Sequence, residues 1–334
     1  MRIGLAGVGR IGAFHAATLA GIGAVDELVL ADVAPDLARH VADELGVGWV
    51  PDVDSLLSAG LDGLVIATAT SAHADLLRRT VALGLPTFCE KPVAVTLAET
   101  VELAGLAATS ETPVQIGFQR RFDRGYRRAA EAVAAGELGF VHTLRANTHD
   151  QSPPHAGYIP TSGGIFRDCN VHDFDAIRFV TGREVETVCA TGSNKGEPFF
   201  AEAGDVDTGA ALLTLDDGTI ALVSATRYNG QGHDVRLEVL GSAGALGVGL
   251  DDTLALRSAE DGVDFPAGPP HASFMQRFLA AYEAELTAFT EVVAGSRPSP
   301  CTVDDALEAF RVAEACERSR HERRVVRLEE ITTR

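Results

Sequence analysis

Residues 2–32 open with Arg2-Ile-Gly-Leu-Ala-Gly-Val-Gly-Arg-Ile-Gly-Ala13 and close with Leu28-Val-Leu-Ala-Asp32. An apolar run leads directly into Gly7-x-Gly9-x-x-Gly12, and a helix-forming segment separates this loop from the second apolar run. Gly7 allows a tight turn, Gly9 lets the backbone approach a pyrophosphate, and Gly12 lets helix and strand pack closely. A strand before the loop and a helix after it predict a dinucleotide-binding unit whose helix N-terminus holds the diphosphate.

Asp32 bears on which dinucleotide binds. A carboxylate at the tip of the second strand accepts hydrogen bonds from the adenosine ribose and repels a 2′-phosphate. Residues 33–35 include no arginine to neutralise such a phosphate, although Arg39 and His40, one turn into the next helix, could reach it. The sequence therefore favours NAD over NADP.

The composition limits the class of protein. The chain has 334 residues, of which 46% are hydrophobic and 22% charged, as in a globular protein long enough for two domains. Its net charge of −19 argues against a nucleic acid or a membrane as partner. The first strand starts at residue 2, no apolar run reaches the ~18 residues of a membrane span, and the five cysteines form no CxxC pair. We therefore expect a cytoplasmic protein with reduced thiols and no structural zinc.

The pattern along the chain changes near residue 120. Before it, apolar segments alternate with amphipathic ones, which predicts an α/β domain with a doubly wound parallel sheet, 1–120. After it, strand-like segments follow one another from 184 to 257 with a hairpin signal at 216–218, which predicts an α+β domain with an antiparallel sheet, 121–334. The expected strands are 3–6, 28–32, 64–68, 87–90 and 114–118, then 187–190, 209–215, 219–226, 235–240 and a pair around 244–256; the expected later helices are 124–135, 168–181, 274–293 and one from 302.

Cys89-Glu90-Lys91-Pro92 ends the strand expected at 87–90. Ligands bind at the carboxyl ends of strands in such a sheet, so the fold would deliver Lys91 to the crevice. Its ammonium would hold a substrate hydroxyl and stabilise the alkoxide that develops during hydride transfer. A surface lysine at a strand end is the alternative.

Asp168, His172 and Asp175 follow the pair Gly163-Gly164 at spacings that place them on one helix face. An acid beside an imidazole orients a general base and raises its pKa, which favours a catalytic His172 over a structural one. These residues could instead ligate a divalent ion, but no second histidine pair at ligand spacing accompanies them, so we predict no metal.

Gly117-Phe-Gln-Arg-Arg-Phe-Asp123 ends the last strand of the first domain. One of its two arginines would reach a polar substrate and the other would bridge the domains. A solvated basic helix start is the alternative.

In the order and spacing that they have along this chain, the four motifs occur in the glucose–fructose oxidoreductase/inositol dehydrogenase (Gfo/Idh/MocA) family. The chain resembles this family over essentially its whole length, and within it the chain is most similar to myo-inositol 2-dehydrogenases. The resemblance implies a Rossmann domain, an open antiparallel sheet in the second domain, and a homotetramer built through those sheets. It implies that Lys91, Asp168 and His172 form the catalytic triad, with His172 as general base. The predicted cofactor-binding residues are Gly7, Gly9, Arg10, Ile11, Gly12, Asp32, Thr68, His73 and Glu90, and the predicted substrate-binding residues are Arg120, His149, Asp150, Tyr158, Asp175 and His233.

The sequence thus predicts NAD-dependent oxidation of a secondary ring hydroxyl of a cyclitol, with myo-inositol to 2-keto-myo-inositol as first choice. His233 stands where many inositol dehydrogenases have a tyrosine, and the loop around Tyr158 also varies in the family, so another inositol isomer or a pyranose sugar stays open. The rivals are an NAD-dependent glycosidase of the same family and a non-catalytic dinucleotide-binding protein, and the intact triad argues against the second.

Overall fold

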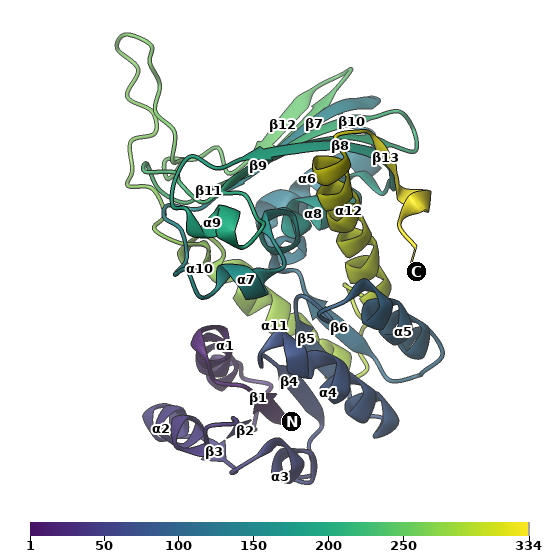
Figure 1. Ribbon diagram of the computed structural model, residues 1–334. Helices are drawn as coiled ribbons and strands as arrows, with labels where there is room; N and C mark the ends of the chain where they lie inside the picture. Colours follow the sequence, from purple (N-terminus) through teal and green to yellow (C-terminus); the bar gives the residue numbers. More distant parts are fainter. Residues whose placement is uncertain (333–334) are drawn as a thin grey trace. The chain divides into compact units, whose positions relative to one another are not determined.

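The computed structural model describes residues 1–332, which form two compact units (Figure 1). The first unit holds residues 1–119 and 280–307, and the second holds residues 120–279 and 308–332. The sequence pattern divides the chain once, near residue 120, and does not indicate that residues 280–307 return to the first unit. The functions assigned to the two parts stay a prediction.

A six-stranded parallel sheet forms the centre of the first unit, in the order β3-β2-β1-β4-β5-β6. This order, which starts from β1 and grows outward on both sides, confirms the doubly wound sheet that the alternating pattern predicts. The short strand β3 was not expected. The strands are β1 Arg2–Ala6, β2 Glu27–Ala31, β3 Gly48–Trp49, β4 Gly63–Ile66, β5 Thr87–Glu90 and β6 Val114–Gly117.

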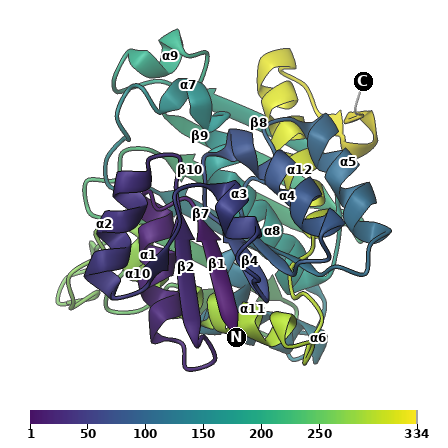
Figure 2. The same ribbon diagram turned by 90° about the horizontal axis from the view of Figure 1, so that it is seen from below.

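Helices cover both faces of this sheet (Figure 2). On one face Leu5 and Leu30 pack in a single buried cluster with residues of α1, α2 and α11, among them Phe289. On the other face Gly4 lies against Leu56 of α3. The helices are α1 Arg10–Gly21, α2 Pro35–Leu45, α3 Val53–Leu57, α4 Thr70–Ala82, α5 Leu97–Ala108 and α11 Leu279–Val293.

Local chemistry explains where several helices begin and end. α2 is capped by Gly46 and α8 (Val171–Thr181) by Gly182, both with positive φ (68° and 63°), a conformation that glycine adopts without a Cβ clash. α6 (Arg124–Ala134) begins after Asp123, whose carboxylate accepts hydrogen bonds from the backbone N–H groups of Gly125 and Tyr126.

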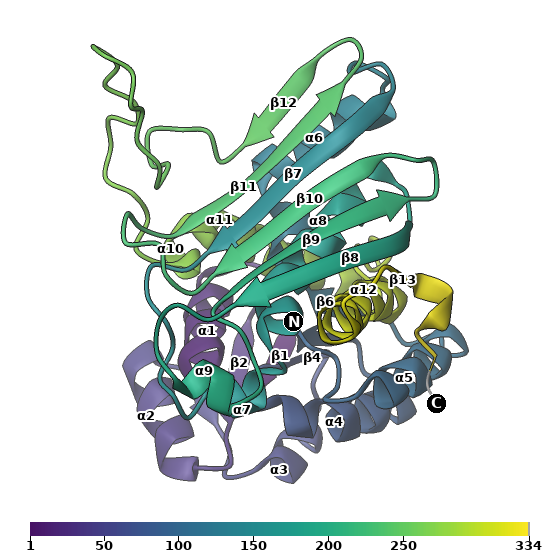
Figure 3. The same ribbon diagram turned by 45° about the horizontal axis from the view of Figure 1, so that its top comes forward.

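The second unit is built on a seven-stranded sheet, in the order β12-β11-β7-β10-β9-β8-β13 (Figure 3). Its pairs are antiparallel except β7 with β10, so the expected antiparallel sheet is confirmed with one parallel pair inside it. The interior strand β7 was not expected, because its buried positions are only Leu144, Ala146 and Thr148, a weak apolar signal. The strands are β7 Val141–His149, β8 Val185–Ser193, β9 Thr208–Leu215, β10 Ile220–Thr226, β11 Asp234–Gly241, β12 Ala245–Val248 and β13 Val326–Arg327.

The two faces of the seven-stranded sheet differ. Alternate residues of β7, β9, β10 and β11 are buried on the face against which α6 and α8 pack. The opposite face carries no helix among residues 1–332 (Figure 3) and exposes Leu212, Ile220 and Leu222. We call this second surface the open face.

Three expected elements differ from the structure. The helix expected from Asp168 begins with a π-helical turn, Phe166–Asn170, and becomes α-helical at Val171. The helix expected over 274–293 is divided into α10 (Phe274–Arg277) and α11, because the buried Phe278 leaves helical geometry. Of the strand pair expected around 244–256, the structure has only β12.

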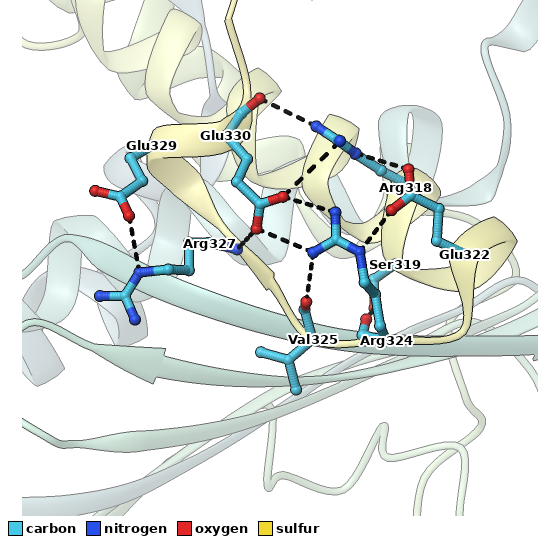
Figure 4. A network of polar contacts seen from close by, with 8 residues as sticks. All are labelled: Arg318, Ser319, Glu322, Arg324, Val325, Arg327, Glu329 and Glu330. Carbon is cyan, nitrogen blue, oxygen red and sulfur yellow. Dashed lines mark hydrogen bonds and ion pairs between the residues drawn. The ribbon is translucent and has the colours of Figure 1, made fainter.

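The C-terminal segment is fastened by ion pairs (Figure 4). Glu330 accepts hydrogen bonds from Arg324 and from the backbone N–H of Arg327, and its backbone carbonyl accepts one from Arg318 of α12 (Val303–Glu322). The short edge strand β13 therefore stays next to β8 although it has only two residues.

Candidate functional site

The glycine loop of the first unit has the geometry of an anion cradle. Gly7 has φ +90°, and a Cβ there would lie 2.7 Å from the backbone of Ala67. A Cβ on Gly12 would lie 1.8 Å from the carbonyl oxygen of Gly7, whereas a Cβ on Gly9 would meet nothing within 4 Å. Two glycines thus permit close packing and the third leaves open space before the helix. α1 has no side-chain cap and no acid in its first turn, so its N-terminal N–H groups suit a diphosphate.

Asp32 lies immediately after β2 and next to this loop. One carboxylate oxygen accepts the N–H of Val8 at 2.8 Å and the other accepts the N–H of Ala34 at 2.9 Å. Each oxygen keeps a second lone pair for a ribose hydroxyl, and the side chain is partly exposed. Arg10 and Ile11, also predicted to contact the cofactor, form the first turn of α1. These residues fit a bound NAD, which would supply a hydride acceptor.

Glu90 and Lys91 lie at the end of β5, as the sequence predicts. Glu90 Oε1 lies 2.6 Å from His15 Nε2 in α1, and Glu90 Oε2 accepts the backbone N–H of Lys91 at 3.2 Å. Glu90 therefore connects the lysine turn to the helix that follows the glycine loop. Sequence reasoning missed His15, and its place three residues after Gly12 was the only available signal.

His73 ties the same turn to the end of β4. Its Nδ1 lies 2.8 Å from the carbonyl oxygen of Pro92 and its Nε2 lies 3.1 Å from that of Thr68. Burial lowers the pKa of the ring, against the effect of the two carbonyls. These contacts explain His73 and Thr68 structurally, and their contact with cofactor stays a prediction.

In the second unit, Asp168 lies in the π-helical turn that precedes α8. Its Oδ2 accepts a hydrogen bond from Arg227 at 2.6 Å, and its Oδ1 accepts one from the Tyr158 hydroxyl at 2.9 Å. π-helical turns are rare and frequently occur at functional sites. His172, the second residue of α8, is half-buried between the buried Val171 and Asp173. The structure thus leaves part of this predicted base accessible.

Asp150 and His233 belong to the same cluster as Asp168. Asp150 Oδ2 accepts a hydrogen bond from Arg227 at 3.0 Å, and Asp150 Oδ1 lies 3.4 Å from His233 Nδ1. Asp150 and Asp168 therefore share Arg227, and Tyr158 and His233 each contact one of these carboxylates. Sequence reasoning did not single out Arg227, because an arginine at a strand end has no distinctive spacing.

Arg120 and Asp175, predicted to contact substrate, are buried in ion pairs. Arg120 pairs with Asp173 and donates to Thr148 at 2.7 Å, and Asp175 accepts hydrogen bonds from Arg121 at 2.6–3.1 Å. Burial disfavours the charged form of Arg120. The attraction of the Asp173 carboxylate is the larger effect and raises the pKa of the guanidinium. These pairs tie residues 120–121 to β7 and α8 within one unit. A contact with substrate stays a prediction, and a solvated helix start is wrong for both arginines.

His149 is separated from its neighbour Asp150. Strand alternation places Thr148 and Asp150 toward the helix-covered face and His149 on the open face, where its Nε2 lies 3.1 Å from Ser224 Oγ. These two neighbouring residues therefore point to opposite faces of the sheet, and a contact of either one with substrate stays a prediction.

Among residues 1–332 no group of three or more His, Cys, Asp or Glu side chains is placed to hold a metal ion. No helix in the described part of the chain is long and apolar enough to cross a membrane.

The parallel sheet and its glycine loop define a Rossmann-type dinucleotide-binding protein. Residues 1–118 match the model of the oxidoreductase family with an NAD-binding Rossmann fold, and residues 126–247 match the GFO/IDH/MocA C-terminal domain. The chain belongs to this GFO/IDH/MocA oxidoreductase family.

Named relatives match along nearly the full length. A myo-inositol dehydrogenase of Streptomyces leeuwenhoekii is 38% identical, over 96% of this chain and 97% of its own. A probable dehydrogenase structure from Thermotoga maritima superimposes with a TM-score of 0.91 at 32% identity, covering 99% and 100% of the two chains. A scyllo-inositol dehydrogenase from Lactobacillus casei, solved with NAD(H) and scyllo-inositol, gives a TM-score of 0.89 at 29% identity, covering 98% and 99%.

Proposed function

We propose that this protein is an inositol dehydrogenase that oxidises one secondary ring hydroxyl of a cyclitol to a ketone with NAD as acceptor. The observation that carries the proposal is that Lys91, Asp168 and His172 are all present in a chain similar over nearly its whole length to myo- and scyllo-inositol dehydrogenases. myo-Inositol is the first-choice substrate, with 2-keto-myo-inositol as product.

Each of the three residues has a chemical task. The His172 imidazole takes the hydroxyl proton as the carbon loses its hydride. The Lys91 ammonium stabilises the negative charge that develops on the substrate oxygen. Asp168, held by Arg227 and Tyr158, orients the imidazole and supports its positive charge. Among the proposed substrate contacts, Asp150, Tyr158 and His233 lie together with Asp168 in the cluster at Arg227.

A screen of NADH formation tests the function. The purified protein is incubated with NAD or NADP and with myo-, scyllo- or chiro-inositol, glucose, galactose or xylose, and Lys91→Met serves as the inactive control. We expect NADH in proportion to a cyclitol consumed and a large loss of kcat/KM in the lysine variant. Glycoside cleavage without net NADH would identify a glycosidase instead, and NAD binding without turnover of any compound would identify a sensor.

We further propose that the protein forms a homotetramer through the open face and that it is located in the cytoplasm. Leu212 and Leu222, which are direct neighbours in the β9–β10 register, are 47% and 46% exposed on that face. An apolar surface of this kind is commonly covered by a second subunit. The five cysteines are free in the structure, which suits a reducing compartment.

A further inference from the structure

We propose that Arg227 is a positioning residue for catalysis, whose guanidinium bridges Asp168 and Asp150 and makes the two carboxylates one electrostatic unit. The proposal deepens the proposed function and rests on it for its kinetic test. It starts from the topology of the sheet. β7 and β10 are parallel neighbours, so Asp150, directly after β7, and Arg227, directly after β10, emerge at the same edge.

The backbone holds Arg227 in place. Its N–H donates to the carbonyl of Asp207 at 2.8 Å, and the N–H of Asp150 donates to the carbonyl of Thr226, also part of the β10 end, at 2.9 Å. The side chain of Arg227 is 5% exposed. The guanidinium is therefore fixed by its strand and does not depend on a mobile surface position.

The guanidinium serves the two carboxylates with different nitrogens. One terminal nitrogen donates to Asp150 at 3.0 Å and the other donates to Asp168 at 2.6 Å. Only arginine offers two such donors in a planar fork, and it stays charged when buried. The remaining oxygen of Asp168 accepts from Tyr158, and that of Asp150 faces His233 at 3.4 Å. Each carboxylate thus contacts the shared cation and at least one further side chain.

Charge explains why the cluster needs this cation. Two carboxylates on one guanidinium leave a net negative charge in a largely buried place, and without Arg227 one of them would take up a proton. Burial opposes ionisation of Asp150, but the contact with His233 and the charge of Arg227 outweigh it and lower the pKa of that carboxyl. Burial and the neighbouring Asp168 raise the pKa of Tyr158, which therefore stays a donor. The further titratable groups beside the cluster are Cys169, whose Sγ lies 3.8 Å from Asp150 Oδ2, His149, which interacts electrostatically with Asp150, and His271, which interacts with His233.

Arg227 connects two carboxylates that have different proposed roles. Asp168 is proposed to support the general base His172, and Asp150 is proposed to contact the polyol. A change in one carboxylate is transmitted to the other through a single shared side chain. Loss of Arg227 should therefore affect turnover and its pH dependence, which a residue important for folding alone would not do in a folded variant.

The kinetic test compares Arg227→Gln and Arg227→Lys with the control Arg178→Gln. Arg178 is another buried arginine, 9% exposed, and it pairs with Glu184 near the C-terminal end of α8. For Arg227→Gln we expect kcat to fall at least tenfold, the acid limb of the kcat profile to move up by about one pH unit or more, and Kd for NAD to stay unchanged. Arg227→Lys should return the acid limb toward its original position. An unchanged kcat and acid limb in folded Arg227→Gln would overturn the proposal.

A second measurement needs no substrate, so it separates this proposal from the proposed function. Infrared difference spectra at neutral pH should show a protonated carboxyl band in Arg227→Gln, absent from the original protein and from Arg178→Gln. The band should disappear in Asp168→Asn/Arg227→Gln if Asp168 carries the proton, or in Asp150→Asn/Arg227→Gln if Asp150 does. Absence of any new band in Arg227→Gln would overturn the electrostatic role even if no polyol is oxidised. If Arg227→Gln does not fold, Arg227→Met is measured in its place, with the same expected band and with the absence of that band again overturning the proposal.

Discussion

His15 Nε2 lies 2.6 Å from Glu90 Oε1, which joins the helix behind the glycine loop to the turn that carries Lys91. The His15 side chain is fully buried, and its ring makes edge contacts with Phe88 and Tyr282. The two residues are 75 positions apart, so this connection exists only in the folded protein.

His15→Ala should weaken both stability and the placement of Lys91. Removing one partner of a buried polar contact lowers the free energy of unfolding by about 1–3 kcal/mol. In this variant the Glu90 carboxylate loses its contact with His15. Urea denaturation should show this loss, and kcat should fall more than the affinity for NAD. His142→Ala, at an exposed histidine on β7, should stay within about 0.5 kcal/mol. Equal stability of the two variants would contradict the prediction.

Asp32→Ala should weaken NAD binding and narrow its advantage over NADP. The loss of a charged hydrogen bond amounts to about 1.5–3 kcal/mol, or roughly tenfold to a hundredfold in Kd. The substitution also removes the acceptor for the N–H groups of Val8 and Ala34. Fluorescence titration with both dinucleotides measures the change, with the exposed Asp36→Ala as control. A protein that prefers NADP before any substitution would show that Asp32 does not bind the ribose.

His172→Ala should affect chemistry and leave cofactor binding unchanged. A positioned general base contributes roughly 10²–10⁴ to kcat. Steady-state kinetics on the best polyol of the screen should show such a fall, while Kd for NAD remains the same. The exposed His40→Ala is the matched control. Near-normal turnover at neutral pH would leave His172 with a structural role.

Leu222→Glu should disrupt the proposed tetramer. The substitution places a charge in the middle of the open face, opposite Leu212. Light scattering coupled to gel filtration should show a smaller assembly, with circular dichroism unchanged. Leu250→Glu changes an equally exposed leucine that lies outside the strands, and should leave the assembly intact. A smaller assembly for both variants, or for neither, would argue against this interface.

The C-terminal network should loosen in acid. Hydrogen bonds from Arg324 and from the Arg327 backbone lower the pKa of Glu330 to about 2, from 4.5. A carboxyl whose pKa is depressed on folding stabilises the fold fully above its unfolded pKa, and this effect is lost as the pH falls from about 4.5 to about 2. Hydrogen exchange of β13 should accelerate over that range. In Glu330→Gln exchange should be fast throughout, whereas Glu329→Gln should keep the pH dependence.

The first unit was largely predictable because its signals are local. A glycine loop, an apolar strand before it and an acid after the next strand lie within 32 consecutive residues, and the turn 89–92 is contiguous with β5. The cluster around Arg227 was not predictable in the same way. Its members come from the ends of β7 and β10, a loop and a π-helical turn, and nothing in their spacing indicates contact.

The sequence by itself determined the parallel sheet, the cofactor loop and the residue types of the proposed chemistry, because backbone conformation and short-range periodicity depend on neighbouring residues. Only the tertiary structure decided on which face of the sheet His149 lies and with which carboxylate each arginine pairs. It alone also decided that Arg227 hydrogen-bonds to both Asp150 and Asp168. Buried charges require partners at hydrogen-bond distance, and those partners are chosen by strand order and register, which bring together residues that are remote in the chain.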